Sequence, residues 1–265
     1  MLLRSVLFVP GGNEKMLAKC ASLEADVIML DLEDAVVPSR KELARNLVAE
    51  LIAGADSTLR KRLWVRVNAW QSGLLEDDLS QIGPLMPTGY LLPKARSAQD
   101  VTDLDRLLDE LELSDEHQRS RIIAMVTEVP EALLNIGSYH ASIPRLEGMS
   151  WGAEDLAAAL GANANRNSDG SWISTFEFAR TQCLIASAAC DVAALDTVYT
   201  NYRDTDGLRE YATVAARDGF DGMLAIHPEQ VAVINAAFTP SQDDVDAARE
   251  VVAAFAGSPH AGAVG

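Results

Sequence analysis

The sequence predicts an α/β fold, a (β/α)8 TIM barrel in which eight parallel strands alternate with helices. Short runs of apolar and β-branched residues recur along the chain, and each is followed by a longer segment with helical spacing. The runs are continuously apolar, as expected for strands of a parallel sheet that is covered on both faces. Eight such units in 265 residues match the size of this fold.

The predicted strands come at regular intervals. In chain order they are residues 6–9, 27–30, 63–67, 90–92, 122–126, 148–151, 197–199 and 223–226. Between them, amphipathic helices are expected at 40–53, 101–111 and 207–217. The alternative is an open doubly wound sheet, but the sequence lacks the glycine-rich turn that binds dinucleotides in that fold.

One barrel domain is expected over residues 1–256. It ends in a helix at 243–255, and no long lid domain is expected after it. Residues 257–265 are rich in glycine and alanine and are expected to form a flexible tail. The polar, turn-rich stretch 163–171 is expected to be a loop over one end of the barrel.

The composition excludes several classes of function. The chain has 22 basic and 39 acidic residues, a formal net charge of −17, which disfavours binding to a nucleic-acid backbone. No apolar run approaches the roughly 18 residues that cross a bilayer, and the first residues lack the pattern of a secretory leader. Cys20, Cys183 and Cys190 show no CxxC spacing. We therefore expect a cytoplasmic protein without disulfides that binds neither nucleic acid nor membrane.

Functional groups are expected where the strands end, because the loops of a (β/α)8 barrel converge at the carboxyl ends of its strands. Polar residues follow most of the predicted strands, namely Asp31, Glu33, Asp34, Arg66, Asn68, Lys94, Glu128, Glu154, Asp155 and His227. Glu128 and Asp155 follow successive strands, so their carboxylates can converge. Two carboxylates without His or Cys partners suit Mg²⁺, or alternatively Mn²⁺. The other interpretation is that one or both acids cap helices.

Arg66 is a charge within an apolar strand, which is costly unless the charge is paired. Its planar guanidinium suits a carboxylate or a developing enolate oxygen. A structural ion pair with Glu33 or Asp34 is equally compatible with its position, and both interpretations can hold together. Lys15 and Lys19 follow a Gly-Gly turn, where they are either phosphate contacts or solvated lysines.

Six motifs occur in a fixed order along the chain. They are residues 4–11 (RSVLFVPG), 31–36 (DLEDAV), 66–68 (RVN), 92–94 (LPK), 152–156 (GAEDL) and 226–230 (IHPEQ). This pattern resembles the citrate lyase β-subunit-like family, which includes malyl-CoA and citramalyl-CoA lyases within the HpcH/HpaI aldolase group. The resemblance extends from Arg4 to about Ala253.

The resemblance implies a Mg²⁺-dependent lyase that makes or breaks a carbon–carbon bond between an acyl thioester and a 2-oxo acid, working as a homotrimer or hexamer. It implies that Glu128 and Asp155 bind the metal and that Arg66, with Glu128, contacts the substrate. By the same resemblance Arg4, Lys15 and Lys19 lie in the stretch that receives the phosphates of CoA.

The sequence departs from the family pattern in three places. Val129-Pro130 stands where Thr-Ala is usual after Glu128, and Met223 replaces a common lysine before the last strand. Longer relatives also carry a lid with a Gly-Lys-Met-Asp-like motif, whose aspartate serves in acid/base chemistry. Without that motif, Glu33 or Asp34 is expected to move the proton, or the thioester reaction is altered or lost.

The leading hypothesis is a lyase that acts on a 3-hydroxyacyl-CoA such as citramalyl-CoA or malyl-CoA. Three alternatives stay open at this point. They are a citrate lyase β-chain acting on a carrier-bound citryl group, a CoA-independent aldolase acting on simple 2-oxo acids, and a catalytically silent metal-binding scaffold.

Overall fold

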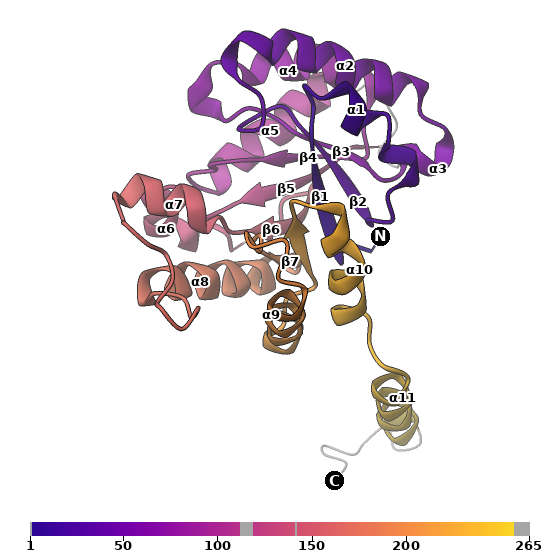
Figure 1. Cartoon of the computed structure of the whole chain (residues 1–265), viewed down its shortest axis with the longest axis vertical. Coiled ribbons are helices and arrows are strands. Elements are labelled where there is room, and N and C mark those ends of the chain that lie inside the picture. The colour runs from indigo at the N-terminus through magenta and orange to yellow at the C-terminus, as the bar shows by residue number, and fades with distance from the viewer. Residues whose placement is uncertain (1, 112–118, 141, 257–265) are drawn as a thin grey trace.

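The chain forms a closed parallel barrel, which confirms the predicted fold class (Figure 1). The structure, a computed structural model, describes residues 2–111, 119–140 and 142–256. Within these residues eight strands follow one another around the barrel in sequence order, and the last pairs with the first. The strands are β1 (Ser5–Pro10), β2 (Val27–Asp31), β3 (Leu63–Arg66), β4 (Gly89–Leu92), β5 (Arg121–Met125), β6 (Leu146–Ser150), β7 (Ala193–Asp196) and β8 (Gly222–Ala225).

Helices lie between consecutive strands on the outside of the barrel, and two more follow the eighth strand (Figure 1). They are α1 (Glu14–Leu17), α2 (Lys41–Gly54), α3 (Ser57–Arg60), α4 (Leu75–Ile82), α5 (Ala98–Leu111), α6 (Pro130–Leu134), α7 (Ala153–Leu160), α8 (Ser174–Cys190), α9 (Thr205–Asp218), α10 (Pro228–Ala237) and α11 (Gln242–Ala256). The helices predicted from periodicity correspond to α2, α5, α9 and α11 to within a few residues. Figure 1 shows α11 beyond α10, apart from the barrel.

The seventh strand was predicted in the wrong place. The β-branched run at 197–199 predicted it, but the strand is β7, Ala193–Asp196, which pairs with β6 and β8. Pairing with both neighbours overrides the low strand propensity of its two alanines. The strand ends at Asp196, whose carboxylate accepts a hydrogen bond from the amide of Thr197. Asp196 is therefore a strand-end acid that the sequence pattern missed.

Side chains alternate along each strand between the inside and the outside of the barrel. They form three apolar clusters, the smallest of which joins Leu7 and Met223 to residues of α9 and α10. One core lies between the strands and the surrounding helices, where Ile28 and Val65 pack with helix residues such as Val48. Another fills the barrel, where Met29, Trp64, Met125 and Leu224 are among its buried members. Because side chains alternate along a strand, this packing determines which residues point into the barrel at its carboxyl end.

The strand register brings polar residues together at that end. Pro10 lies opposite Asp31, and Asp31 lies opposite Arg66, which in turn lies opposite Leu91. An acid and a base thus end neighbouring strands side by side. The sequence predicted Glu33 or Asp34 as the ion-pair partner of Arg66, whereas the structure pairs it with Asp31 and Glu33.

Two further expectations concern the ends and the surface of the chain. The predicted tail at 257–265 lies outside the described residues, and the division of the chain at 256 stays a prediction. No helix in the described part of the chain combines the length and the apolar character that crossing a membrane would require.

A substitution in β8 tests the closure of the barrel. A Cβ at Gly222 would lie 1.9 Å from the carbonyl oxygen of Leu3 and 2.7 Å from that of Arg4, both main-chain atoms that cannot rotate away. We expect Gly222→Ala to lower the free energy of unfolding by about 3 kcal/mol, at the upper end of the usual cost of overpacking. Urea denaturation measures it. Gly54→Ala is the control, because that position is open and helical, and it should not destabilise the protein.

Candidate active site

A cavity of about 350 Å³ opens at the carboxyl end of the barrel. Its described lining residues come from the ends of most of the strands and from the loops that follow them. They are Phe8, Pro10, Asp31, Asp34, Ala35, Arg66, Met125, Glu128, Gly152, Ala153, Glu154, Asp155, Thr197, Val198, Leu224 and Ile226. The structure thus brings together Arg66, Asp34, Glu128 and Asp155, four of the residues that the sequence predicted as site residues.

Arg66 is held by two carboxylates and an aromatic ring. Its Nε and one terminal nitrogen donate to the two oxygens of Asp31 over 2.7 and 2.5 Å. The other terminal nitrogen lies 3.1 Å from Oε2 of Glu33, and the guanidinium carbon lies 4.6 Å from the ring centre of Phe8. Burial opposes the charge, but the charge and hydrogen bonds of Asp31 raise the pKa of Arg66. Arg66 is therefore a fixed cation at the cavity.

Glu33 and Asp34 are neighbours in sequence but differ in exposure. The side chain of Glu33 is 7% exposed and contacts Arg66 and Lys94, whereas that of Asp34 is 57% exposed and lines the cavity. Burial raises the pKa of Glu33. Partial burial of Asp34 is outweighed by its hydrogen bond from Lys94, so its pKa is lowered. Of the two acids predicted to move a proton, Asp34 is the one that reaches the cavity.

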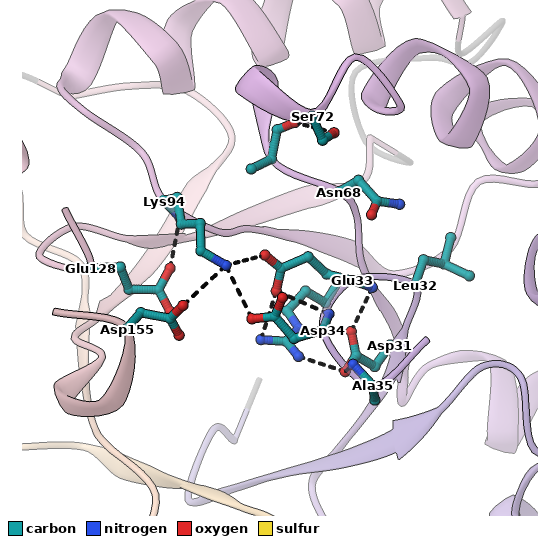
Figure 2. A network of polar contacts seen from close by, with 12 residues as sticks. Asp31, Leu32, Glu33, Asp34, Ala35, Asn68, Ser72, Lys94, Glu128 and Asp155 are labelled. Atoms are coloured by element: carbon teal, nitrogen blue, oxygen red, sulfur yellow. Dashed lines mark hydrogen bonds and ion pairs between the residues drawn. The ribbon is translucent and has the colours of Figure 1, made fainter. Parts of the chain in front are cut away.

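Lys94 connects the acidic residues of the site, as Figure 2 shows. Its ammonium contacts Glu33, lies 3.0 Å from Oδ2 of Asp34 and lies 3.1 Å from Oδ1 of Asp155. Its main-chain N–H donates to Oε2 of Glu128 over 2.7 Å. The residue has a left-handed backbone (φ 52°), which is uncommon outside glycine. One strained residue thus contacts both acids predicted as metal ligands.

The role of Lys94 was not predicted, although its position at the end of a strand was noted. The LPK motif places a lysine there, but a local pattern does not specify the left-handed turn that directs its N–H and its ammonium to different acids.

Glu128 is buried, with 3% of its surface exposed. Burial, together with the charges of Asp155 and Glu33, raises its pKa to about 8. The structure makes room for it at Gly152, where an added Cβ would lie 2.6 Å from Cγ and 2.7 Å from Oε1 of Glu128. Asp155 is in the first turn of α7 and its side chain is 31% exposed. The two acids line the same cavity.

The alternative interpretation of these acids as helix caps does not fit the structure. Helix α7 has Gly152 as its N-cap and helix α6 has Val129, and neither cap makes a side-chain hydrogen bond. Neither Glu128 nor Asp155 is therefore the N-cap residue of a helix.

The donor set suits a divalent cation with open coordination positions. When ionised, five carboxylates outnumber the three cations described near them, Arg66, Lys94 and Lys41; the carboxylates are those of Asp31, Glu33, Asp34, Glu128 and Asp155. In the described part of the chain, no three His, Cys, Asp or Glu side chains form a group that could hold a metal alone. Mg²⁺ is commonly coordinated by one or two protein carboxylates, with water or substrate oxygens as its other ligands.

The predicted phosphate contacts lie apart from the cavity. Lys15, on α1, and Lys19, just after it, are exposed and are not among the lining residues. Arg4 precedes β1, so it lies at the opposite end of the barrel, where its guanidinium is bonded to Asp26 and Thr239. The structure separates Arg4 from the other predicted site residues, because a residue before a strand lies at the strand's amino end.

Asp196, at the end of β7, is fully buried and completely hydrogen-bonded. Its Oδ1 accepts from the indole N–H of Trp151 (2.7 Å) and the hydroxyl of Tyr211 (3.0 Å), and its Oδ2 accepts from Arg180. His227, one of the polar residues that follow a predicted strand, caps α10 and stacks on Tyr202. Neither residue lines the cavity described above.

The chain matches the family described as HpcH/HpaI aldolase/citrate lyase over residues 4–228. The mitochondrial citramalyl-CoA lyase of Mus musculus is 32% identical over 263 residues, covering 95% of this chain and 76% of the mouse protein. A (3S)-malyl-CoA thioesterase of Cereibacter sphaeroides is 34% identical over 252 residues, covering 95% of this chain and 82% of that protein.

A crystal structure of protein CitE from Mycobacterium tuberculosis, in complex with magnesium, acetoacetate and coenzyme A, has the same fold. The TM-score is 0.80 at 34% identity, over 96% of this chain and 88% of that one. Sequence motifs, barrel and relatives agree, and the chain belongs to the HpcH/HpaI aldolase/citrate lyase family of enzymes.

Proposed function

We propose that the protein is a Mg²⁺-dependent carbon–carbon lyase that converts a 3-hydroxyacyl-CoA, such as citramalyl-CoA or malyl-CoA, to an acyl-CoA and a 2-oxo acid. The observation that carries the proposal is the shared cavity wall of Glu128 and Asp155, with the fixed cation Arg66 facing the same space. The name of the mouse relative and the magnesium, acetoacetate and coenzyme A of the CitE complex support it.

Glu128 and Asp155 would hold the metal, Mg²⁺ or alternatively Mn²⁺. The raised pKa of Glu128 and the excess of carboxylates are both relieved by a dication at this position. When bound, the metal supplies Lewis-acid polarisation of the substrate's oxygen atoms.

Arg66 is suited to stabilise negative charge on the substrate. A guanidinium has five N–H donors, and the contacts with Asp31 and Glu33 use at least three of them. Arg66 also lines the cavity, so a remaining donor would be available to an enolate oxygen that develops charge during cleavage. Asp34, which lines the same cavity, is the carboxylate that we propose for proton transfer, and Glu33 holds Arg66 and Lys94 in place.

The CoA phosphates require cations outside the cavity. We propose the exposed lysines Lys15 and Lys19 for this contact and leave Arg4 out, because it lies at the other end of the barrel. We also propose that the chain assembles as a homotrimer or hexamer, as the family resemblance implies.

The proposed metal ligands can be tested by isosteric substitution. We expect Glu128→Gln and Asp155→Asn each to weaken Mg²⁺ binding, measured by calorimetry, at least roughly 100-fold, because each removes one of only two protein ligands. Release of a 2-oxo acid from citramalyl-CoA or malyl-CoA should be lost with it. Glu131→Gln, an exposed acid in the first turn of α6, is the control. Unchanged Mg²⁺ affinity in both folded variants would contradict the proposal, and CoA release without a 2-oxo acid would indicate thioester hydrolysis.

A second test changes the site without touching a charge. In Gly152→Ala the added methyl group would press on Glu128, so Mg²⁺ affinity should fall about tenfold, the lower range for altered support of a metal ligand. Gly137→Ala, at an open position, should bind Mg²⁺ as the unsubstituted protein does. Equal affinity of both variants would mean that the position of Glu128 does not matter for the metal.

Arg66→Lys tests the substrate contact. Lysine keeps the charge but lacks the planar fork that bonds both oxygens of Asp31. We expect kcat to fall by about 100-fold, the typical effect of losing one donor to a developing oxyanion, while Mg²⁺ binding is retained. Steady-state kinetics and calorimetry on the same samples separate the two effects. Turnover at the original rate would remove Arg66 from the mechanism.

A further inference from the structure

We propose that three hydrogen-bonded residues outside the cavity, Lys41, Asn68 and Asp78, position the loop after β2 for the reaction. None of these three described residues, called the Lys41 cluster below, is among those that line the cavity. They are therefore positioning residues, which act through the loop. This role rests on the proposed function, which assigns Asp34 in that loop to proton transfer.

The ammonium of Lys41, the first residue of α2, is bonded entirely to carbonyl oxygens. It donates to the main-chain oxygens of Leu32 and Glu33 over 2.6 and 2.8 Å, and to Oδ1 of Asn68 over 2.6 Å. An ammonium has three N–H donors, so these three acceptors account for all of them. Lys41 thus joins the loop after β2 to a residue that lies two positions beyond the end of β3.

The same loop is held through its N–H groups by Asp31. Oδ1 of Asp31 accepts from the N–H of Glu33 over 2.8 Å, and Oδ2 accepts from the N–H of Ala35 over 3.3 Å. The loop therefore has its donors fixed by Asp31 and two of its carbonyl oxygens fixed by Lys41. With both sets of bonds in place, it presents the side chain of Asp34 to the cavity.

Asn68 connects Lys41 to a buried acid. Asn68 is 2% exposed, and its Nδ2 and main-chain N–H donate to Oδ2 of Asp78 over 2.7 and 2.8 Å. Asp78, on α4, is fully buried, and its Oδ1 lies 3.2 Å from a guanidinium nitrogen of Arg45. Arg45 is one turn after Lys41 in α2, so the contacts return to the helix on which they start.

Apolar packing alone does not specify this geometry. Val48 of α2 and Leu79 of α4 already belong to the core between the helices and the strands, and such contacts are not directional. A buried polar group is costly unless it is hydrogen-bonded, whereas a fully bonded polar group favours one arrangement of its surroundings. The bonds of the Lys41 cluster lead to the loop that carries Asp34, and we infer that its position is what they fix.

The kinetic test is Lys41→Met, which removes all three donors and keeps an unbranched side chain. We expect kcat for 2-oxo acid release from citramalyl-CoA or malyl-CoA to fall at least about tenfold, because small displacements of a reacting group slow the chemistry strongly. KM and Mg²⁺ affinity should be retained, because the described bonds of the cluster do not reach Glu128 or Asp155. Lys61→Met, at an exposed lysine after α3, is the matched control.

Amide hydrogen exchange tests the loop without substrate or metal. On the full chain, followed by mass spectrometry, we expect peptides that cover residues 31–36 to exchange at least about tenfold faster in Lys41→Met, because their local opening becomes easier. Peptides from β6 should be unaffected. Asn68→Asp is the second variant if Lys41→Met does not fold. It preserves the size of the side chain but places a carboxylate, without the amide donor, beside Asp78.

Leu79→Ala separates lost stability from lost positioning. Leu79 is a buried neighbour of Asp78 on α4, and its truncation destabilises the helix packing while removing only apolar contacts. Its folded fraction should keep the original kcat.

Each outcome decides between a positioning role and its alternatives. Unchanged exchange of residues 31–36, or an unchanged kcat, in folded Lys41→Met would overturn the inference and leave the lyase proposal intact. An equal fall of kcat in Leu79→Ala would also overturn it, because general stability would then explain the effect. If the unsubstituted protein releases no 2-oxo acid, the proposed function fails, and the exchange of residues 31–36 still decides whether the cluster holds the loop.

Discussion

The ion pair between Arg66 and Asp31 is the contact on which the arrangement of the site depends. It joins the last residues of β2 and β3, which the strand register sets side by side, through two short hydrogen bonds. The same guanidinium then reaches Glu33, and Glu33 reaches Lys94. Several ionised carboxylates close together at one end of a barrel repel one another. The chain of alternating charges from Asp31 to Lys94 is what lets these acids stay together.

Removing one charged residue of this network destabilises the protein by more than the loss of that residue's own contacts. The reason is that a partly buried partner keeps a charge that no longer has a counter-charge. This explains why the acids of the site are supported by structural features at other positions. Gly152 lacks a side chain where Glu128 needs space, and Lys94 adopts a left-handed backbone where its N–H meets the same carboxylate. The left-handed backbone of Lys94 and the glycine at 152 therefore both serve to hold the carboxylate of Glu128 in the cavity wall.

Much of this could be predicted from the sequence because the barrel links order along the chain to position in space. Continuous apolar runs predict strands, and residues after a strand lie at one end, so Arg66, Glu128 and Asp155 were predicted to meet. Arg4 was placed in the site by resemblance alone, and the same rule sends it to the opposite end. Asp196 was missed because its strand contains two alanines and precedes a more β-like run. The contacts of Lys94 were not predicted, because a left-handed turn depends on the surroundings of the residue.

Asp196 and Asp31 are residues of the same type at the same end of the barrel, but they have different roles. Both are buried acids that close a strand. Asp31 holds Arg66 at the cavity, so its charge pair is part of the site. Asp196 accepts hydrogen bonds from Trp151, Tyr211 and Arg180. The cavity beside β7 and β8 is lined instead by Thr197, Val198, Leu224 and Ile226. The charged lining residues therefore lie between the ends of β2 and β6, because Asp31 lines the cavity beside Arg66 whereas Asp196 is enclosed by its own partners.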